Sequence, residues 1–222
     1  MATVTEIWRY PVKSMAGEQL DSCLIGEHGL EGDRRWALID GSPNRAGKRL
    51  TIRQHERLMN YQARLSNGRV EVLAPTGETR MLDDHFVQRL QAESSRPLTL
   101  NDMAGANFDD SHLLIVNLAT VEAFGAASAM HVDHRRFRAN LYVAGLQPEE
   151  EISWVGRHIR AGDAELEVVS RCERCVVITR DPDTAQTSPE LLRSLTEQYE
   201  TCMGVYCQVV RPGRVAVADF AG

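Results

Sequence analysis

The sequence predicts a mainly β protein with a few helices, and three observations carry this prediction. Short apolar or alternating runs recur between turn residues, as at residues 69–73 and 164–168. The pair Asn67 and Gly68 separates two such runs and is a strong short-range signal for a β-hairpin. Helical signals are confined to a few segments in the middle and near the end of the chain. Regularly spaced short strands with few helices indicate a barrel or a curled sheet.

The first third of the chain contains most of the evident strand signals. Residues 3–10 are rich in β-branched and aromatic side chains and end before Pro11, which is typical of a strand. Residues 35–40 form a short apolar run that enters a turn at residues 41–44. Residues 58–65 and 69–73 flank the Asn-Gly turn, so we expect them to pair as a hairpin.

The middle and the end of the chain mix helices with strands. We expect helices at residues 84–92, at residues 117–124 with Asn117 as the cap, and at residues 189–199 with Pro189 in the first turn. Strands are expected at residues 113–116, 141–144, 164–168, 176–179, 205–210 and 215–217.

Composition limits the classes of function. The chain has 222 residues, which suits one large domain or two small packed ones, and a net charge of -6. An acidic chain has no overall basic field to attract nucleic acid or an anionic membrane. No apolar run approaches the roughly 20 residues that span a bilayer, and the first residues do not resemble a secretory signal. The odd number of cysteines, five, favours thiols or ligands in a reducing cytoplasm.

Two cysteines lie three residues apart, at Cys172 and Cys175, with an arginine between them. A thiolate is a soft metal ligand, and an adjacent arginine favours the thiolate and attracts anions. A thioredoxin-like pair is a second interpretation, but it requires a helix to start at the motif, and a strand is expected there. A structural zinc site would need Cys202 and Cys207 as well. Two partly buried cysteines without a role are the simplest interpretation.

Three basic segments are candidates for anion binding. Lys13 and Ser14 follow the first strand, where they form either a phosphate contact or a solvated turn. Arg34 begins the next strand, and alternation would place it on one face and Arg35 on the other. The cluster of arginines at residues 135, 136 and 138 precedes a buried strand. If that segment is extended, Arg138 shares a side with Asn140 and could clamp a phosphate; a charged approach to a strand is the alternative.

These segments, taken in order, resemble one family. The resemblance is carried by Tyr10-Pro11-Val12-Lys13-Ser14, Asp33-Arg34-Arg35-Trp36, Phe137-Arg138-Ala139-Asn140, Cys172-Glu173-Arg174-Cys175 and Asp181-Pro182-Asp183-Thr184. Together they resemble the MOSC (molybdenum cofactor sulfurase C-terminal) proteins, in the subgroup of the mitochondrial amidoxime-reducing components and their bacterial relatives. One departure is Ala185, which stands where the family usually has glycine, so that turn is expected to differ.

The resemblance implies a fold and a set of site residues. It implies an N-terminal β-barrel-like part at residues 1–95, packed on a C-terminal MOSC β-barrel at residues 96–222, with a molybdenum–pterin cofactor between them. By the same resemblance, Cys175 is the catalytic metal ligand. The pterin and its phosphate are expected to contact Lys13, Ser14, Arg34, Ser111, Arg138 and Asn140.

The resemblance also implies an activity. It implies a cytoplasmic molybdenum-cofactor oxidoreductase that reduces small N-hydroxylated or N-oxide compounds. Electrons are expected from a separate protein of the ferredoxin, flavoprotein or cytochrome type, because no flavin, haem or iron–sulfur signature is evident. Nucleic acid and membrane are not expected partners. A non-catalytic cofactor carrier or a sulfur-transfer module is the alternative, and a relative that no longer binds molybdenum is a third.

Overall fold

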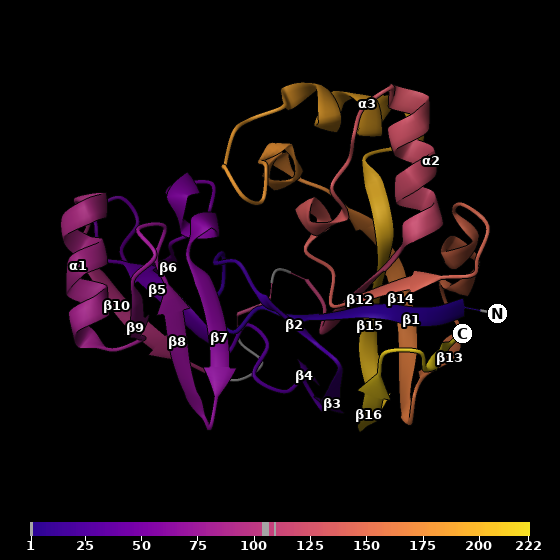
Figure 1. The fold of residues 1–222 in the computed structure, drawn as a ribbon, viewed down its shortest axis with the longest axis horizontal. Helices are drawn as coiled ribbons and strands as arrows, with labels where there is room; N and C mark the ends of the chain where they lie inside the picture. The colour runs from indigo at the N-terminus through magenta and orange to yellow at the C-terminus, as the bar shows by residue number, and fades with distance from the viewer. Residues whose placement is uncertain (1, 104–106, 109) are drawn as a thin grey trace. The chain divides into compact units, whose positions relative to one another are not determined.

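The computed structural model describes residues 2–103, 107–108 and 110–222, and strands dominate among them. The predicted mainly β class with a few helices is confirmed. The chain divides into two compact units (Figure 1). Unit 1 comprises Met1–Trp8, Gln19–Glu31 and Asp109–Gly222, and unit 2 comprises Arg9–Glu18 and Gly32–Phe108. The expected division at residues 95 and 96 stays a prediction.

Unit 1 contains a closed β-barrel. Strand β1 (Ala2–Arg9) pairs with β12 (Leu141–Ala144) along one edge and with β17 (Phe220–Ala221) along the other, which closes the sheet on itself. The sheet runs in the order β12, β11, β15, β14, β13, β17, β1, and β2 (Glu18–Leu20) continues it beyond β1. The remaining barrel strands are β11 (Leu113–Asn117), β13 (His158–Ala161), β14 (Ala164–Glu173) and β15 (Cys202–Arg211).

Strand β11 is buried on both faces, which explains its uninterrupted apolar sequence. Leu113 and Ile115 pack in the core formed by the inner side chains of the barrel. Leu114 and Val116 alternate with them and belong to a second core, which includes side chains of the helices α2 and α3. The barrel wall is therefore covered on both sides at this strand.

The helices of unit 1 begin where the sequence predicts. Helix α2 (Leu118–Ser128) is capped by Asn117, whose side-chain oxygen accepts from the Ala119 N–H at 3.1 Å. Helix α3 (Pro189–Tyr199) has proline in its first turn. Both helices contribute to the second core through Phe124 and Leu195. A small sheet of β16 (Gly213–Ala216), β3 (Ser22–Gly26) and β4 (Gly29–Leu30) completes the strands of this unit.

The described residues of unit 2 form two three-stranded sheets, one α-helix and one 3-10 helix. The predicted Asn-Gly hairpin is confirmed as β7 (Gln62–Ser66) and β8 (Arg69–Leu73), extended by β9 (Thr79–Met81). The second sheet has the order β10 (Leu98–Asp102), β5 (Trp36–Asp40), β6 (Lys48–Arg49). Helix α1 (Asp84–Ser94) lies beside β10 (Figure 1) and buries Phe86, Val87 and Leu90 in the core of this unit.

Short 3-10 helices replace the start of one expected strand and the whole of another. Residues 56–60 form the 3-10 helix η1 (Glu56–Asn60), so the first hairpin strand begins later than expected, at Gln62. The segment after Cys175 forms η4 (Val176–Thr179), although its residues are β-branched. The other 3-10 helices are η2 (His134–Phe137) and η3 (Glu150–Trp154). Across the part of the chain that the structure describes, no helix is long and apolar enough to cross a membrane.

Candidate functional site

The two motif cysteines have different environments. Cys172 lies in β14 and is fully buried, whereas Cys175 lies two residues beyond the end of that strand and is partly exposed. Both are free thiols. Within the described residues, no group of three or more His, Cys, Asp or Glu side chains could hold a metal, so the four-cysteine zinc alternative is not formed. Cys175 is therefore the motif thiol that a ligand can reach.

Arg174 connects the two motif cysteines to a second segment of unit 1. Its Nη1 donates to the Cys172 sulfur at 2.7 Å, and its Nη2 donates to the Phe137 carbonyl oxygen at 2.6 Å. The guanidinium also lies 5.6 Å from the centre of the Phe137 ring, within cation–π range. The motif arginine is thus held by protein groups on both sides of its planar fork.

The segment that precedes β12, residues 133–140, is named here the arginine turn. Asp133 caps η2 by accepting from the Arg135 N–H at 2.8 Å, and Arg138, the residue after the end of η2, has a φ of 51°. This left-handed conformation is uncommon for a residue with a side chain. The extended run on which Arg138 and Asn140 would share one side is therefore not formed, because Arg138 has a left-handed backbone.

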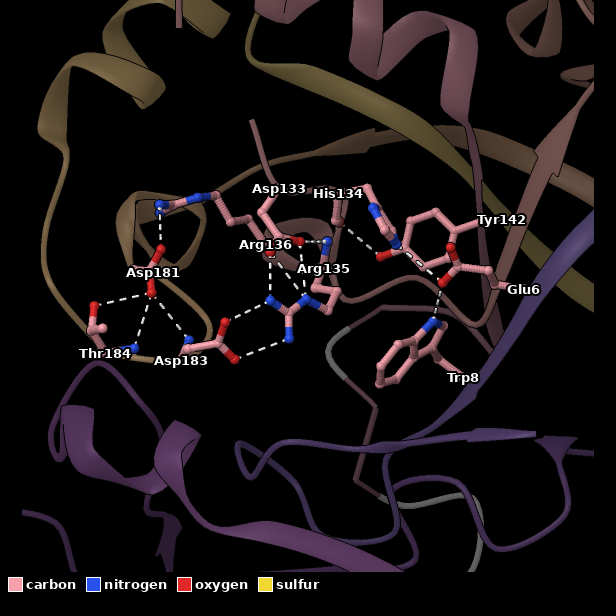
Figure 2. A network of polar contacts seen from close by, with 10 residues as sticks. All are labelled: Glu6, Trp8, Asp133, His134, Arg135, Arg136, Tyr142, Asp181, Asp183 and Thr184. Atoms are coloured by element: carbon pink, nitrogen blue, oxygen red, sulfur yellow. Dashed lines mark hydrogen bonds and ion pairs between the residues drawn. The ribbon is translucent and has the colours of Figure 1, made fainter. Parts of the chain in front are cut away.

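The segment from Cys172 to Thr184 is named here the thiol loop, and it carries the aspartates that pair with the arginine turn (Figure 2). Arg135 pairs with Asp133 at 2.6 Å and with Asp183 at 2.7 Å. Arg136 donates to Asp181 at 3.0 Å. The first two arginines of the basic cluster are thus neutralised by carboxylates, and neither of the two interpretations made from the sequence had included those partners.

Asp181 has a second role in the thiol loop (Figure 2). One carboxylate oxygen accepts from the Thr184 N–H at 2.9 Å and from the Asp183 N–H at 3.1 Å, while the other receives Arg136. These hydrogen bonds and the Arg136 charge lower the pKa of Asp181, although its burial acts in the opposite direction and is the largest single influence. The turn continues to Ala185, whose φ of 59° is the left-handed conformation that favours glycine.

Another set of contacts ties the arginine turn to the barrel (Figure 2). A carboxylate oxygen of Glu6 in β1 accepts from the Trp8 indole N–H at 2.6 Å and lies 3.1 Å from the His134 Nε2. The Tyr142 hydroxyl in β12 donates to the His134 carbonyl oxygen at 2.8 Å. The turn is therefore anchored to two neighbouring barrel strands.

Two of the predicted cofactor-binding residues contact the barrel backbone. The Asn140 side-chain oxygen accepts from the Leu114 N–H at 3.2 Å, and its amide nitrogen donates to the Trp8 carbonyl at 3.3 Å. The Ser111 hydroxyl donates to the Cys207 carbonyl at 2.8 Å. Both side chains are buried, so each has a structural role in unit 1. Their part in cofactor binding stays a prediction.

Unit 2 brings Lys13, Ser14 and Arg34 together through backbone contacts. The Lys13 N–H donates to the Trp36 carbonyl at 2.8 Å, and the Arg34 N–H donates to the Tyr10 carbonyl at 2.8 Å. The buried Lys13 ammonium donates to the Asn107 carbonyl at 2.6 Å. Ser14 and Arg34 have φ values of 72° and 48°, so both have a left-handed backbone conformation.

Arg34 is fixed by its neighbours in unit 2. Its guanidinium lies 4.9 Å from the centre of the Tyr10 ring and pairs with the buried Asp33 carboxylate. Asp33 also accepts from the Tyr10 N–H at 2.7 Å. The predicted strand geometry at Arg34 is wrong, because the residue lies in the turn before β5, whereas Arg35 reaches the exposed Asp102 at 2.6 Å. For the pair of Arg34 with Asp33, the sequence signal was that the two residues are adjacent.

Family models match both parts of the chain. The model described as MOSC domain matches residues 101–220, and the model described as MOSC N-terminal beta barrel domain matches residues 1–117. Each match covers more than half of the 222 residues. The chain belongs to the MOSC domain family. The resemblance seen in the five motifs is thereby confirmed, and the closed barrel of unit 1 belongs to a MOSC protein.

Named relatives extend over almost the whole MOSC chain. Mitochondrial amidoxime-reducing component 1 of Mus musculus is 23% identical over 99% of this chain and 81% of its own length. The Homo sapiens protein of the same name is 24% identical over 99% of this chain and 82% of its own. Molybdenum cofactor sulfurase of Danio rerio is 24% identical over 92% of this chain but only 31% of its own length.

A solved structure supports the fold of this MOSC chain. The YuaD protein of Bacillus subtilis has a TM-score of 0.55 and 15% sequence identity, covering 99% of this chain and 93% of its own. At this identity the likeness concerns the fold alone. Sequence and structure therefore agree on a MOSC-type β fold whose relatives include amidoxime-reducing components and molybdenum cofactor sulfurases.

Proposed function

We propose that this MOSC protein is a molybdenum-cofactor oxidoreductase that reduces N-hydroxylated or N-oxide compounds, with Cys175 as the thiolate ligand of molybdenum. An amidoxime is an N-hydroxylated amidine, and relatives named for amidoxime reduction align with 99% of this chain. The proposal includes a cytoplasmic location and a separate electron-donor protein of the ferredoxin, flavoprotein or cytochrome type.

The placement of Cys175 is the single observation that carries the proposal. Cys172 is fully buried and its sulfur accepts from Arg174, whereas Cys175 is partly exposed in the thiol loop. A free, accessible thiol is a suitable ligand for a soft transition metal. The same loop is joined to the arginine turn that carries Arg138. The proposed metal ligand and the proposed phosphate ligand thus belong to two connected segments of unit 1.

The residues of each unit fit the chemistry of an anionic molybdenum–pterin group. Unit 2 offers the cations Lys13 and Arg34 with the hydroxyl of Ser14, all close in the fold and held by their backbone. Unit 1 offers the Cys175 thiol and the Arg138 guanidinium, with Ser111 and Asn140 at the barrel wall. Guanidinium groups suit the bidentate binding of phosphate, and a lysine acts as a point charge.

In this proposal the bound cofactor supplies two-electron redox chemistry. The chain supplies binding and orientation: Cys175 provides one sulfur, Arg34 and Arg138 hold phosphate oxygens, and Lys13 offsets negative charge. Reduction of an N-hydroxylated compound consumes two electrons and two protons and releases the amine or amidine with water. The electrons come from the donor protein, and the protons come from solvent.

The proposal is tested by separate replacement of the two motif cysteines. Wild-type protein and each variant are purified from a host that makes the cofactor, and their molybdenum and pterin contents are measured. Turnover is measured separately, as reduction of an amidoxime with an artificial reductant. Cys175→Ala should abolish turnover and remove one protein sulfur from the molybdenum X-ray absorption spectrum. The matched variant Cys172→Ala should keep that sulfur and part of the activity, because Cys172 lies in the core. Equal loss in both folded variants would contradict the assignment.

Other results of this experiment would favour the other functions. Molybdenum bound without turnover would indicate a carrier. Protein without molybdenum but with a sulfane sulfur on Cys175 would indicate sulfur transfer. One relative is named a molybdenum cofactor sulfurase. Protein with neither would be a MOSC domain that has lost the cofactor.

The electron supply provides an independent prediction. The purified chain should not oxidise NADH or NADPH by itself, and turnover should appear with a small-molecule reductant or after a reductase system is added. The measurement is NADH absorbance during incubation with an amidoxime. Rapid oxidation of NADH by the pure chain would contradict the need for a separate donor protein.

A further inference from the structure

The arginine turn and the thiol loop contact each other through arginines from both sides. Arg174, the residue before Cys175, donates to the carbonyl of Phe137, the residue before Arg138, at 2.6 Å. Arg136, two residues before Arg138, donates to the Ile178 carbonyl at 3.4 Å and to Asp181 at 3.0 Å. Each segment therefore holds the backbone of the other.

These contacts act close to Cys175. The Ile178 N–H donates to the Cys175 carbonyl at 3.2 Å. Arg136 therefore contacts a residue that is hydrogen-bonded to the Cys175 backbone. Arg174 is adjacent to Cys175 in the chain, and its other fork nitrogen is fixed by the buried Cys172 sulfur. The thiol is thus restrained from both directions along the loop.

Burial makes the Arg136 contact stronger than an ordinary surface pair. In the Arg136–Asp181 pair the side chains are 8% and 31% exposed, whereas in the Arg135–Asp183 pair they are 33% and 67% exposed. Water and salt screen the more exposed pair and leave little stabilisation, while the partly buried charge-assisted hydrogen bond is screened less. The two aspartates of the loop therefore differ in what they can hold, although they lie two residues apart.

We propose that Arg136 and Arg174 are positioning residues for Cys175: they hold the thiol loop on the arginine turn and fix the Cys175 thiol relative to the Arg138 backbone. Although these arginines belong to basic motifs, they bind carbonyl, sulfur and carboxylate groups of the protein. The idea that these contacts position a metal ligand rests on the proposed function. The contacts that restrain Cys175 do not depend on it.

The test uses the full chain from a host that cannot make the cofactor, and it measures the alkylation rate of each cysteine by iodoacetamide and peptide mass spectrometry. Asp181→Asn is the first variant, because the amide oxygen can still accept from the Thr184 N–H while the charge facing Arg136 is lost. We expect Cys175 to be alkylated about tenfold faster, which is the size of effect expected when one charge-assisted hydrogen bond is lost.

Two further variants calibrate the result. Asp183→Asn removes an equal charge from the same loop, where that charge forms the exposed pair with Arg135, so the Cys175 rate should stay within about twofold of wild type. Arg174→Lys keeps the charge but cannot reach both the Cys172 sulfur and the Phe137 carbonyl, so the Cys175 rate should rise at least as much as in Asp181→Asn.

The fully buried Cys207 serves as the internal control for unfolding. Its alkylation should stay slow in each variant while that of Cys175 rises. An unchanged Cys175 rate in both Asp181→Asn and Arg174→Lys would overturn the proposal, as would an equal rise at Cys175 and Cys207, which indicates global loosening. Because no cofactor is present, these outcomes are independent of the molybdenum content that tests the proposed function.

Discussion

The two units neutralise their buried charges in different ways. In unit 2 the fully buried carboxylates of Asp33 and Asp40 pair with arginines, Asp33 with the adjacent Arg34. In unit 1 the fully buried Glu151 carboxylate accepts from the neutral side chains of Asn117 at 2.9 Å and Thr120 at 3.0 Å. The arginines of unit 1 instead join two segments 45 to 48 residues apart in sequence. Arginines join distant segments in both units, since Arg96 and Asp40 of unit 2 lie 56 residues apart. The units differ in whether a fully buried carboxylate is paired with arginine or receives neutral donors.

The largest effect is expected at Asp33 in unit 2. Asp33→Ala leaves the Tyr10 N–H without its acceptor and Arg34 without its carboxylate, so the free energy of unfolding should fall by about 3 kcal/mol. Urea unfolding measures this change. Asp102→Ala is the control, because it removes the exposed partner of Arg35 and should cost less than about 1 kcal/mol. Similar losses in the two variants would remove the distinction between a buried and a surface pair.

The contrast at Glu151 should appear as a pH dependence. Burial raises the pKa of the Glu151 carboxyl, so the folded state favours its protonated form. Wild-type stability should then decrease as pH rises from about 4.3, the ordinary value for glutamate, through the raised pKa. Glu151→Gln lacks this loss, so its Tm relative to wild type should increase between about pH 4 and pH 7.

The control for this experiment lies in the same 3-10 helix, η3. Glu150→Gln removes an exposed carboxylate, and its Tm difference from wild type should show no comparable trend with pH. Thermal unfolding followed by circular dichroism in a series of buffers measures both variants. A Tm difference for Glu151→Gln that is constant over the range would mean that the buried carboxyl titrates normally.

The smallest effects concern the backbone, where the two units should behave alike. Ser14 in unit 2 and Ala185 in unit 1 both have left-handed φ values, 72° and 59°. Replacement of either by glycine should raise the free energy of unfolding by about 1 kcal/mol, because glycine adopts this conformation without a steric cost. Ser14→Ala keeps the Cβ and should give no such gain. Loss of stability in Ala185→Gly would mean that packing of the alanine methyl outweighs the strain.

Local signals allowed much of the fold to be predicted from the sequence. The Asn67 and Gly68 turn, the Asn117 cap and Pro189 each specify a local backbone geometry, and the hairpin and both helices are present. Residues 176–179 were expected as a strand because they are β-branched, but they form η4. Strand preference depends on neighbouring strands and burial, and Val176 is 47% exposed outside the barrel.

The candidate site was predictable in residue type but not in geometry. The position of Cys175 in an accessible loop follows from the end of β14 at Glu173. The left-handed turns at Arg34 and Arg138 could not be read from residues that usually avoid them. The pairing of Arg136 with Asp181 joins residues 45 apart, and one sequence contains no signal for such a contact.

Closure of the barrel has a consequence for the order in which the chain folds. Strand β1 pairs with β12 through Thr3 and Ala144 and with β17 through Ala2 and Ala221, so the two strands that close the barrel against it are synthesised long after it. Its third partner, β2, follows it closely in the chain. The longer segment of unit 2, residues 32–108, is complete before either neighbour leaves the ribosome. Unit 2 can therefore fold early, while the backbone groups of β1 that pair with β12 and β17 remain unpaired. Pairing over such distances is slow, and an open strand edge invites association with other chains. The barrel, rather than unit 2, is where aggregation during synthesis should begin.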